Sequence, residues 1–222
     1  MTYDGQPPSD AEKYFGNDIE YIKKRWDNRA DRWDDDLSDK FCHLNRNNSY
    51  QMFIDILTQE IDKDAKFHNS SGFLDLGCGT GELLRLFSNN FLWSCGIDIS
   101  AKMLECARNK LNDNILLLEG SVFDASIYPN KNISVIASRG VLLSHYGDKM
   151  AEDLMCICYK LLAQNGFIFF DAINSKSADL PSNKRCYSGC ELIELAVKAG
   201  FSSAVTIGDE KYPLLYLKAV KH

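Results

Sequence analysis

Short apolar runs alternate with segments of helical periodicity from Gly72 to the end of the chain, and this alternation constrains the fold more than any other feature. It is typical of a parallel sheet that helices cover on both faces. The last two runs are joined by Gly208-Asp209-Glu210, a link too short for a parallel crossover, so we expect that pair to be antiparallel. The sequence therefore predicts an α/β fold with a doubly wound, mostly parallel seven-stranded sheet and an antiparallel terminal strand pair. The predicted strands are residues 73–76, 92–97, 115–118, 133–137, 167–171, 201–207 and 214–220.

The helices of this core are expected between the strands, at about residues 81–88, 100–111 and 148–162. A last helix follows Ser188, where Glu191 three residues later completes a capping box, and it ends at Gly200.

Two further helices are expected before the core. One begins at Asn17 and carries apolar residues at three- and four-residue steps as far as Leu37, and the next begins at Asn48 or Ser49. The length of 222 residues suits one domain, with an N-terminal arm and helices in residues 1–66 and the sheet core in residues 67–222.

The charge balance disfavours several partners. The chain has 31 acidic and 25 basic residues, a formal charge of −6, so its surface repels polyanions unless basic residues cluster. We therefore expect no nucleic acid and no membrane partner. Residues 1–10 are polar and lack the features of a signal peptide, so the eight cysteines suit reduced thiols in the cytoplasm. Their spacing matches no zinc site and the four histidines are scattered, so we predict no metal.

The most informative segment is a predicted strand that runs through a Gly-rich turn into a helix. In an open parallel sheet, ligands bind at such a turn, because glycine lets the backbone approach them closely. An acidic residue, Asp98, ends the next predicted strand at the spacing that suits a contact with both hydroxyls of a ribose. The segment reads Phe73-Leu74-Asp75-Leu76-Gly77-Cys78-Gly79-Thr80-Gly81-Glu82-Leu83-Leu84.

Charge separates two kinds of ligand for this turn. A dinucleotide pyrophosphate needs bare N–H groups at the start of the helix, yet Asp75 precedes the turn and Glu82 stands where the third glycine of the dinucleotide fingerprint belongs. Two carboxylates would repel a pyrophosphate, whereas they favour a ligand that carries an ammonium and a sulfonium.

These residues resemble motif I of the class I S-adenosylmethionine-dependent methyltransferases, and the likeness extends from about Trp26 to Phe201. The resemblance implies a Rossmann-like core with N-terminal lid helices and S-adenosyl-L-methionine as cofactor. Asp75 would lie near the cofactor ammonium and Asp98 would hold the ribose. The family often has Asp at the position of Ser121, so Asp124 or a backbone carbonyl could contact the adenine amino group. The cofactor residues implied are Trp26, Trp33, Asp75, Gly77, Cys78, Gly79, Asp98, Ile99, Met103, Ser121, Val122 and Arg139.

The segment from Trp26 to Asp34 is similar to the aromatic-x-x-x-Ala-x-x-aromatic helix that covers the cofactor in small-molecule members of this family. Trp26 and Trp33 are seven residues apart and so share one helix face, which also suits two core side chains. Both interpretations stay open at this point, and one does not exclude the other.

Residues 137–146 resemble the family's loop at the mouth of the methyl-transfer site. Arg139 is placed there to meet the methionine moiety or an acidic group of the substrate, or else forms a surface ion pair. His145 is the candidate catalytic base because an imidazole titrates near neutral pH, with a structural role at a helix start as the alternative. Tyr21, Tyr146 and Tyr187 are the candidate substrate residues, with packing as their alternative.

The predicted function is transfer of a methyl group from S-adenosylmethionine to a nitrogen or oxygen of a small metabolite. The sequence lacks the motifs of enzymes that methylate amino groups of bases, glutamine amides or pyrimidine carbon atoms. Substrate specificity is expected from the N-terminal helices and from the insertion at residues 173–187. The acidic balance slightly favours an amine substrate. Two alternatives remain open, a non-catalytic S-adenosylmethionine-binding protein and a nicotinamide-dependent oxidoreductase. The oligomeric state cannot be predicted from the sequence.

Overall fold

A computed structural model describes residues 19–34, 46–63, 70–140, 142–177, 180–181, 184–208 and 212–222. The predicted arm at the N-terminus, the far end of the first predicted helix and most of the link Gly208-Asp209-Glu210 lie outside these residues.

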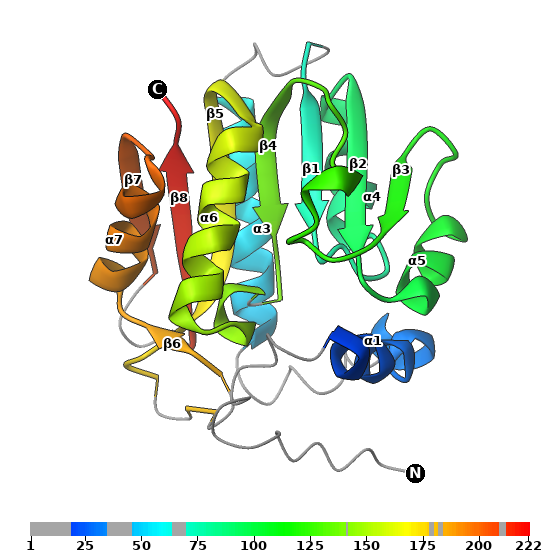
Figure 1. Cartoon of the computed structure of the whole chain (residues 1–222), viewed down its shortest axis with the longest axis horizontal. Helices are drawn as coiled ribbons and strands as arrows, with labels where there is room; N and C mark the ends of the chain where they lie inside the picture. Colours follow the sequence, from blue (N-terminus) through cyan, green and yellow to red (C-terminus); the bar gives the residue numbers. More distant parts are fainter. Residues whose placement is uncertain are drawn as a thin grey trace.

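One mixed sheet organises the described part of the chain, in the order β3-β2-β1-β4-β5-β8-β7, with β6 beside β5. Neighbouring strands from β3 to β5 are parallel, whereas β8 is antiparallel to both β5 and β7. β1 lies between β2 and β4 in the sheet (Figure 1). The chain continues from β1 to β2 and β3 on one side and then crosses to β4 on the other side, so the strand order reverses at β1. The strands are β1 Gly72–Leu76, β2 Trp93–Asp98, β3 Leu116–Glu119, β4 Ile133–Ser138, β5 Leu162–Asn174, β6 Cys186–Tyr187, β7 Ser203–Ile207 and β8 Leu214–Val220.

The sequence prediction of the sheet needs two corrections. The described sheet has eight strands rather than seven, because Cys186–Tyr187 pairs in parallel with Ile173 and Asn174. A two-residue strand is too short to show an alternating pattern. β5 also begins at Leu162, five residues earlier than expected, where the predicted helix was still continuing.

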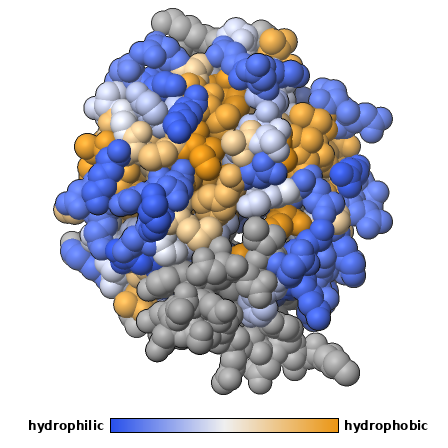
Figure 2. All heavy atoms as spheres, viewed as in Figure 1, coloured by the Kyte–Doolittle hydropathy of each residue, from blue (hydrophilic) through white to orange (hydrophobic). Residues whose placement is uncertain are grey.

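Helices cover both faces of the sheet, as Figure 1 shows with α6 and α7 in front and α3 behind. The helices around the core are α3 Arg46–Asp62, α4 Glu82–Phe87, α5 Ala101–Arg108, α6 Asp148–Leu161 and α7 Gly189–Ala199. Hydrophilic side chains dominate the outer surface of α6 and α7, with apolar patches between them (Figure 2). None of the described helices is both long and apolar enough to cross a membrane.

The pleat of β1 divides its buried side chains between the two layers. Phe73 packs in one core with Phe53 and Leu57 of α3, and Leu74 and Leu76 pack in the other core. Asp75 is buried on the same side of the strand as Phe73. The strand that leads into the Gly-rich turn is therefore fixed on both faces.

The first predicted helix is broken into two shorter segments, which corrects the prediction of one continuous helix from Asn17. In the described residues α1 spans Ile19–Asp27, and a 3-10 helix, η2, spans Ala30–Arg32. The Asp27 carboxylate accepts a hydrogen bond from Ser100 Oγ at 2.6 Å, at the start of α5. Ala30 is buried, and its carbonyl accepts a contact from Cys106 Sγ at 3.8 Å. The chain turns between these two anchors, of which one is the N-cap residue of α5 and the other lies within α5.

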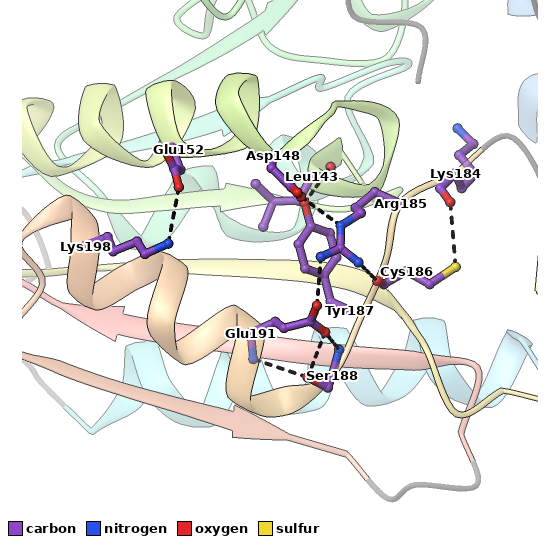
Figure 3. Close-up of polar contacts among 10 residues, drawn as sticks. All are labelled: Leu143, Asp148, Glu152, Lys184, Arg185, Cys186, Tyr187, Ser188, Glu191 and Lys198. Carbon is purple, nitrogen blue, oxygen red and sulfur yellow. Dashed lines mark hydrogen bonds and ion pairs between the residues drawn. The ribbon is translucent and has the colours of Figure 1, made fainter. Parts of the chain in front are cut away.

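The capping box predicted at the start of α7 is confirmed. Ser188 Oγ accepts a hydrogen bond from Glu191 N at 3.3 Å, and Ser188 N donates to Glu191 Oε2 at 2.7 Å. Arg185 extends this network, because its guanidinium pairs with Glu191 at 2.7 Å and with Asp148 of α6 at 2.8 Å (Figure 3). These contacts hold the chain before α7 against the start of α6.

Candidate functional site

The Gly-rich turn joins the carboxyl end of β1 to α4 and is tied to the end of β2. Gly77 and Gly79 adopt positive φ angles of 69° and 53°, which side chains other than glycine rarely tolerate. The N–H groups of Gly77 and Cys78 donate to the carbonyl of Ile97 at 2.8 and 3.0 Å. These hydrogen bonds hold the turn in place beside the last residues of β2.

Asp98 links the turn to the start of α5. It is 8% exposed, and its two carboxylate oxygens accept hydrogen bonds from Gly79 N and Ser100 N, each at 2.8 Å. Burial raises the pKa of Asp98 to about 6, although these backbone hydrogen bonds act in the opposite direction. A hydroxyl-bearing ligand would find a fixed and strong acceptor here.

Asp75 is the second buried carboxyl group of the site, at 2% exposed. Burial raises its pKa to about 8; nearby Arg139 lowers the pKa, and Asp98 raises it. A carboxyl group with so high a pKa gains most from a cationic neighbour, because a positive charge favours its ionised form.

One cavity of about 780 Å³ brings the predicted residues together. All twelve residues expected at the cofactor line it, from Trp26 in α1 to Arg139 after β4, and so do His145 and Tyr146. Tyr21 and Tyr187 are not among its lining residues. Tyr187 is instead buried, with its hydroxyl 3.4 Å from the carbonyl of Leu143. The cavity opens at the point where the strand order reverses, which is where open α/β sheets bind ligands.

Trp33 lies against the turn and packs on Trp26. Their ring centroids are 5.2 Å apart in an edge-on arrangement. A Cβ atom at Gly79 would lie 3.7 Å from Trp33 Nε1, so Trp33 reaches the turn itself. Asp34 accepts a hydrogen bond from Thr80 Oγ1 at 2.7 Å and pairs with Lys110. The segment after α1 thus closes one side of the cavity.

His145 ends the 3-10 helix η6 (Leu142–His145) and lies flat against Trp26, with ring centroids 5.9 Å apart and planes inclined by 4°. Burial lowers the pKa of His145 well below its usual range, and the positive charges of Lys184 and Arg25 lower it further. Its imidazole is therefore neutral at neutral pH, and it is a weaker base than a solvent-exposed histidine. Burial raises the pKa of Tyr146 above its ordinary value, so its hydroxyl stays protonated.

Asp124 does not reach the cavity, which argues against one of the two options for the adenine contact. Its side chain is exposed and accepts hydrogen bonds from Ser126 N and Ser126 Oγ at 2.9 and 2.6 Å. Ser121 and Val122 line the cavity directly, so a backbone carbonyl of this segment is the remaining option.

Several lining residues were not predicted from the sequence. The Arg139 guanidinium lies 3.8 Å from the centroid of the Tyr50 ring, so α3 contributes to the site. Arg25 and Arg29 enter from the N-terminal segment and Lys184 from the insertion before β6. The insertion was expected to line the cavity, but a single lysine in a polar loop gives no sequence signal of its own.

Comparison with known proteins bears on what this site does. Residues 73–166 match the family described as "Methyltransferase domain". The chain is 34% identical over 91 residues to an uncharacterized methyltransferase, C70.08c, of Schizosaccharomyces pombe, a match that covers 40% of this chain and 35% of that protein. It is 33% identical over 113 residues to the uncharacterized protein MJ1252 of Methanocaldococcus jannaschii, covering 51% of this chain and 36% of that protein. The matches thus span about a third of either relative.

Solved structures resemble the whole described fold. Magnesium protoporphyrin IX methyltransferase (ChlM) from Synechocystis PCC 6803, with bound SAM, has a TM-score of 0.71 at 16% identity, covering 92% of this chain and 97% of that one. DhpI in complex with SAH has a TM-score of 0.69 at 18% identity, covering 90% and 95%. These similarities confirm the predicted mostly parallel sheet with its antiparallel strand pair.

Proposed function

We propose that this chain carries a class I S-adenosylmethionine-dependent methyltransferase domain. It binds S-adenosylmethionine at the turn after β1 and methylates a nitrogen or oxygen atom of a small metabolite. The observation that carries this proposal is the single cavity that joins the turn and Asp98 to His145 and Tyr146. Cofactor and acceptor can therefore share one continuous cavity.

The chemistry of the lining fits the cofactor. Asp98 offers an ionisable acceptor to ribose hydroxyls, and Asp75 offers a carboxyl group whose ionised form a cation stabilises. Ile99, Met103 and Val122 supply apolar contact for the adenine ring. Glu82 also lines the cavity at the first turn of α4, which disfavours a dinucleotide pyrophosphate.

The bound cofactor would supply an activated methyl group on a cationic sulfur atom. The residues of this chain then have three tasks, which are to exclude water, to orient the acceptor atom and to take up a proton. Trp26 and Trp33 cover the cavity beside the turn. His145, neutral and stacked on Trp26, is the proposed proton acceptor.

Four features of the proposal stay predictions from the sequence. They are the cytoplasmic location, the single-domain organisation, the small-molecule substrate and the choice of nitrogen or oxygen as acceptor.

The test incubates the full chain with methyl-labelled S-adenosylmethionine and a panel of small amines, phenols and carboxylic acids. We expect labelled product together with S-adenosylhomocysteine. Calorimetry should detect binding of S-adenosylhomocysteine and none of NAD or NADP. Binding without product from any acceptor would instead identify a non-catalytic cofactor-binding protein, and binding of the dinucleotides alone would refute the proposal.

A further inference from the structure

We propose that Arg139, stacked on Tyr50, forms a carboxylate-binding site inside the cavity. The carboxylate belongs to one of two molecules, the cofactor at its amino-acid end or the acceptor substrate, and the experiment below separates these sources. This inference rests on the proposed function and gives Arg139 one of the roles that the sequence left open.

The register of the sheet places Arg139 on the same face as Asp75. Asp75 of β1 pairs with Ala137 of β4, and paired residues of neighbouring strands point to the same side of a sheet. Arg139 stands two residues beyond Ala137, so the alternation of the strand directs it to that side as well. Its contact with Tyr50 agrees, because α3 packs against this face. Strand register and a ring contact therefore fix the position of Arg139 independently of each other.

The guanidinium group of Arg139 is ordered through one of its planar faces. Its central carbon lies 3.8 Å from the centroid of the Tyr50 ring, close enough for a cation–π contact. The N–H groups lie in the guanidinium plane, so stacking leaves them to other partners. The chain directly after Arg139 is also held, because Gly140 N donates to the two carboxylate oxygens of Asp171 at 3.1 and 3.0 Å.

The described residues leave part of the hydrogen-bonding capacity of Arg139 unsatisfied. Its Nε atom is buried and has no hydrogen-bond partner in the part of the chain that the structure describes. Glu82 binds Arg85 instead, at 2.8 and 3.1 Å. Burial raises the pKa of Asp75 to about 8, so this carboxyl group is mostly protonated at neutral pH. A carboxylate ligand would supply the missing acceptor in the planar geometry that a guanidinium group prefers.

The cavity extends from Arg139 in two directions. On one side lie Asp75 and the Gly-rich turn, where the cofactor would place an ammonium and a carboxylate on the same carbon atom. Asp75 and Arg139 suit these two opposite charges. On the other side the lining continues with Asp171 and Ile173 of β5 and with Leu214 of β8, which lie beyond β4 in the sheet. An acceptor over these strands would meet the same guanidinium group from that side.

The test uses two pairs of ligands that differ in a carboxylate. The first pair, S-adenosylhomocysteine and decarboxylated S-adenosylhomocysteine, is titrated into the full chain. The second pair, benzoate and its neutral counterpart benzamide, is titrated into the full chain saturated with S-adenosylhomocysteine. Calorimetry should show at least about tenfold tighter binding of the carboxylate in one of the pairs. A preference in the first pair identifies the cofactor as the source, and a preference in the second pair alone identifies an acidic acceptor.

Two substitutions connect the preference to Arg139. Arg139→Gln should reduce it to about threefold or less, because it removes the guanidinium group. Tyr50→Leu should reduce it by a smaller factor, because the charge stays and only the ordering ring is lost. Arg108→Gln is the matched control and should leave the preference unchanged, since Arg108 is exposed in the last turn of α5 and does not line the cavity.

Thermal unfolding of each variant shows whether it is folded. If Arg139→Gln does not fold, the native chain and Tyr50→Leu still decide the question. The inference is overturned if the native chain shows no carboxylate preference in either pair, or if the preference persists in a folded Arg139→Gln variant. Absence of any binding of S-adenosylhomocysteine refutes the proposed function, whereas its normal binding without a carboxylate preference refutes only the site at Arg139.

Discussion

Removing the charge of Asp98 should weaken cofactor binding and also loosen the Gly-rich turn, because one of the two backbone N–H groups loses its acceptor. Asp98→Asn keeps the size of the side chain but replaces one acceptor oxygen with an N–H donor. In the native chain both oxygens accept backbone N–H groups at 2.8 Å, so the side chain is already oriented toward the Gly-rich turn. The substitution therefore changes the chemistry of an ordered group.

The magnitude follows from the type of hydrogen bond that is lost. A hydrogen bond to a charged group contributes about 1.5–3 kcal/mol, so loss of one ribose contact should weaken affinity about 10- to 150-fold. Loss of both contacts would weaken it further. The low exposure of Asp98, 8%, means that solvent screens the interaction little.

The assay is calorimetric titration of S-adenosylhomocysteine into the native chain and the variant, well below the unfolding midpoint of either. Asp124→Asn is the matched control, because Asp124 also accepts an N–H two residues ahead, at 2.9 Å, but is exposed outside the cavity. The control should bind normally. An Asp98→Asn dissociation constant within about twofold of the native value would refute the ribose assignment.

Three further predictions test the site and its support. The cofactor's positive charge should lower the pKa of Asp75 from about 8, so binding should release protons, and the affinity for the cofactor should rise with pH up to about 8 and then stay constant. Titrations of S-adenosylmethionine in buffers of different ionisation enthalpy measure the protons released, and an affinity that does not depend on pH would contradict the prediction. His145→Ala should lower kcat by about a hundredfold in the labelled-methyl assay, whereas unchanged turnover and an unchanged pH profile would exclude His145 as the base. Gly96→Ala would place a Cβ atom 2.6 Å from Leu84 Cδ1 and 2.7 Å from Cys78 Sγ, so it should destabilise the chain by about 1–3 kcal/mol in urea unfolding; an unshifted midpoint would refute this packing.

The features that sequence predicted well are those determined by short segments. The strand, turn and helix around Gly77 and Gly79 are contiguous in the sequence. Because the apolar runs predict a parallel sheet, the turn is expected at the edge formed by the carboxyl ends of the strands. Asp98 ends the adjacent parallel strand, so its proximity to the turn follows from topology. The capping box at Ser188 is likewise complete within four residues.

The features that sequence missed depend on contacts between distant residues. The first helix breaks where Asp27 binds Ser100, 73 residues away, and the helical periodicity continues through the break. Arg25 and Arg29 occupy what looks from the sequence like a solvated helix face. Only the folded chain brings them and Lys184 to the wall of one cavity.

A crystal structure of the full chain grown with S-adenosylhomocysteine tests the central claim most directly. The account predicts density for the adenosyl group against Gly77 and Gly79, with the ribose hydroxyls on Asp98 and the amino group near Asp75. Well-ordered ligand density at any other position, or an intact turn that remains free of ligand at saturating concentration, would contradict it.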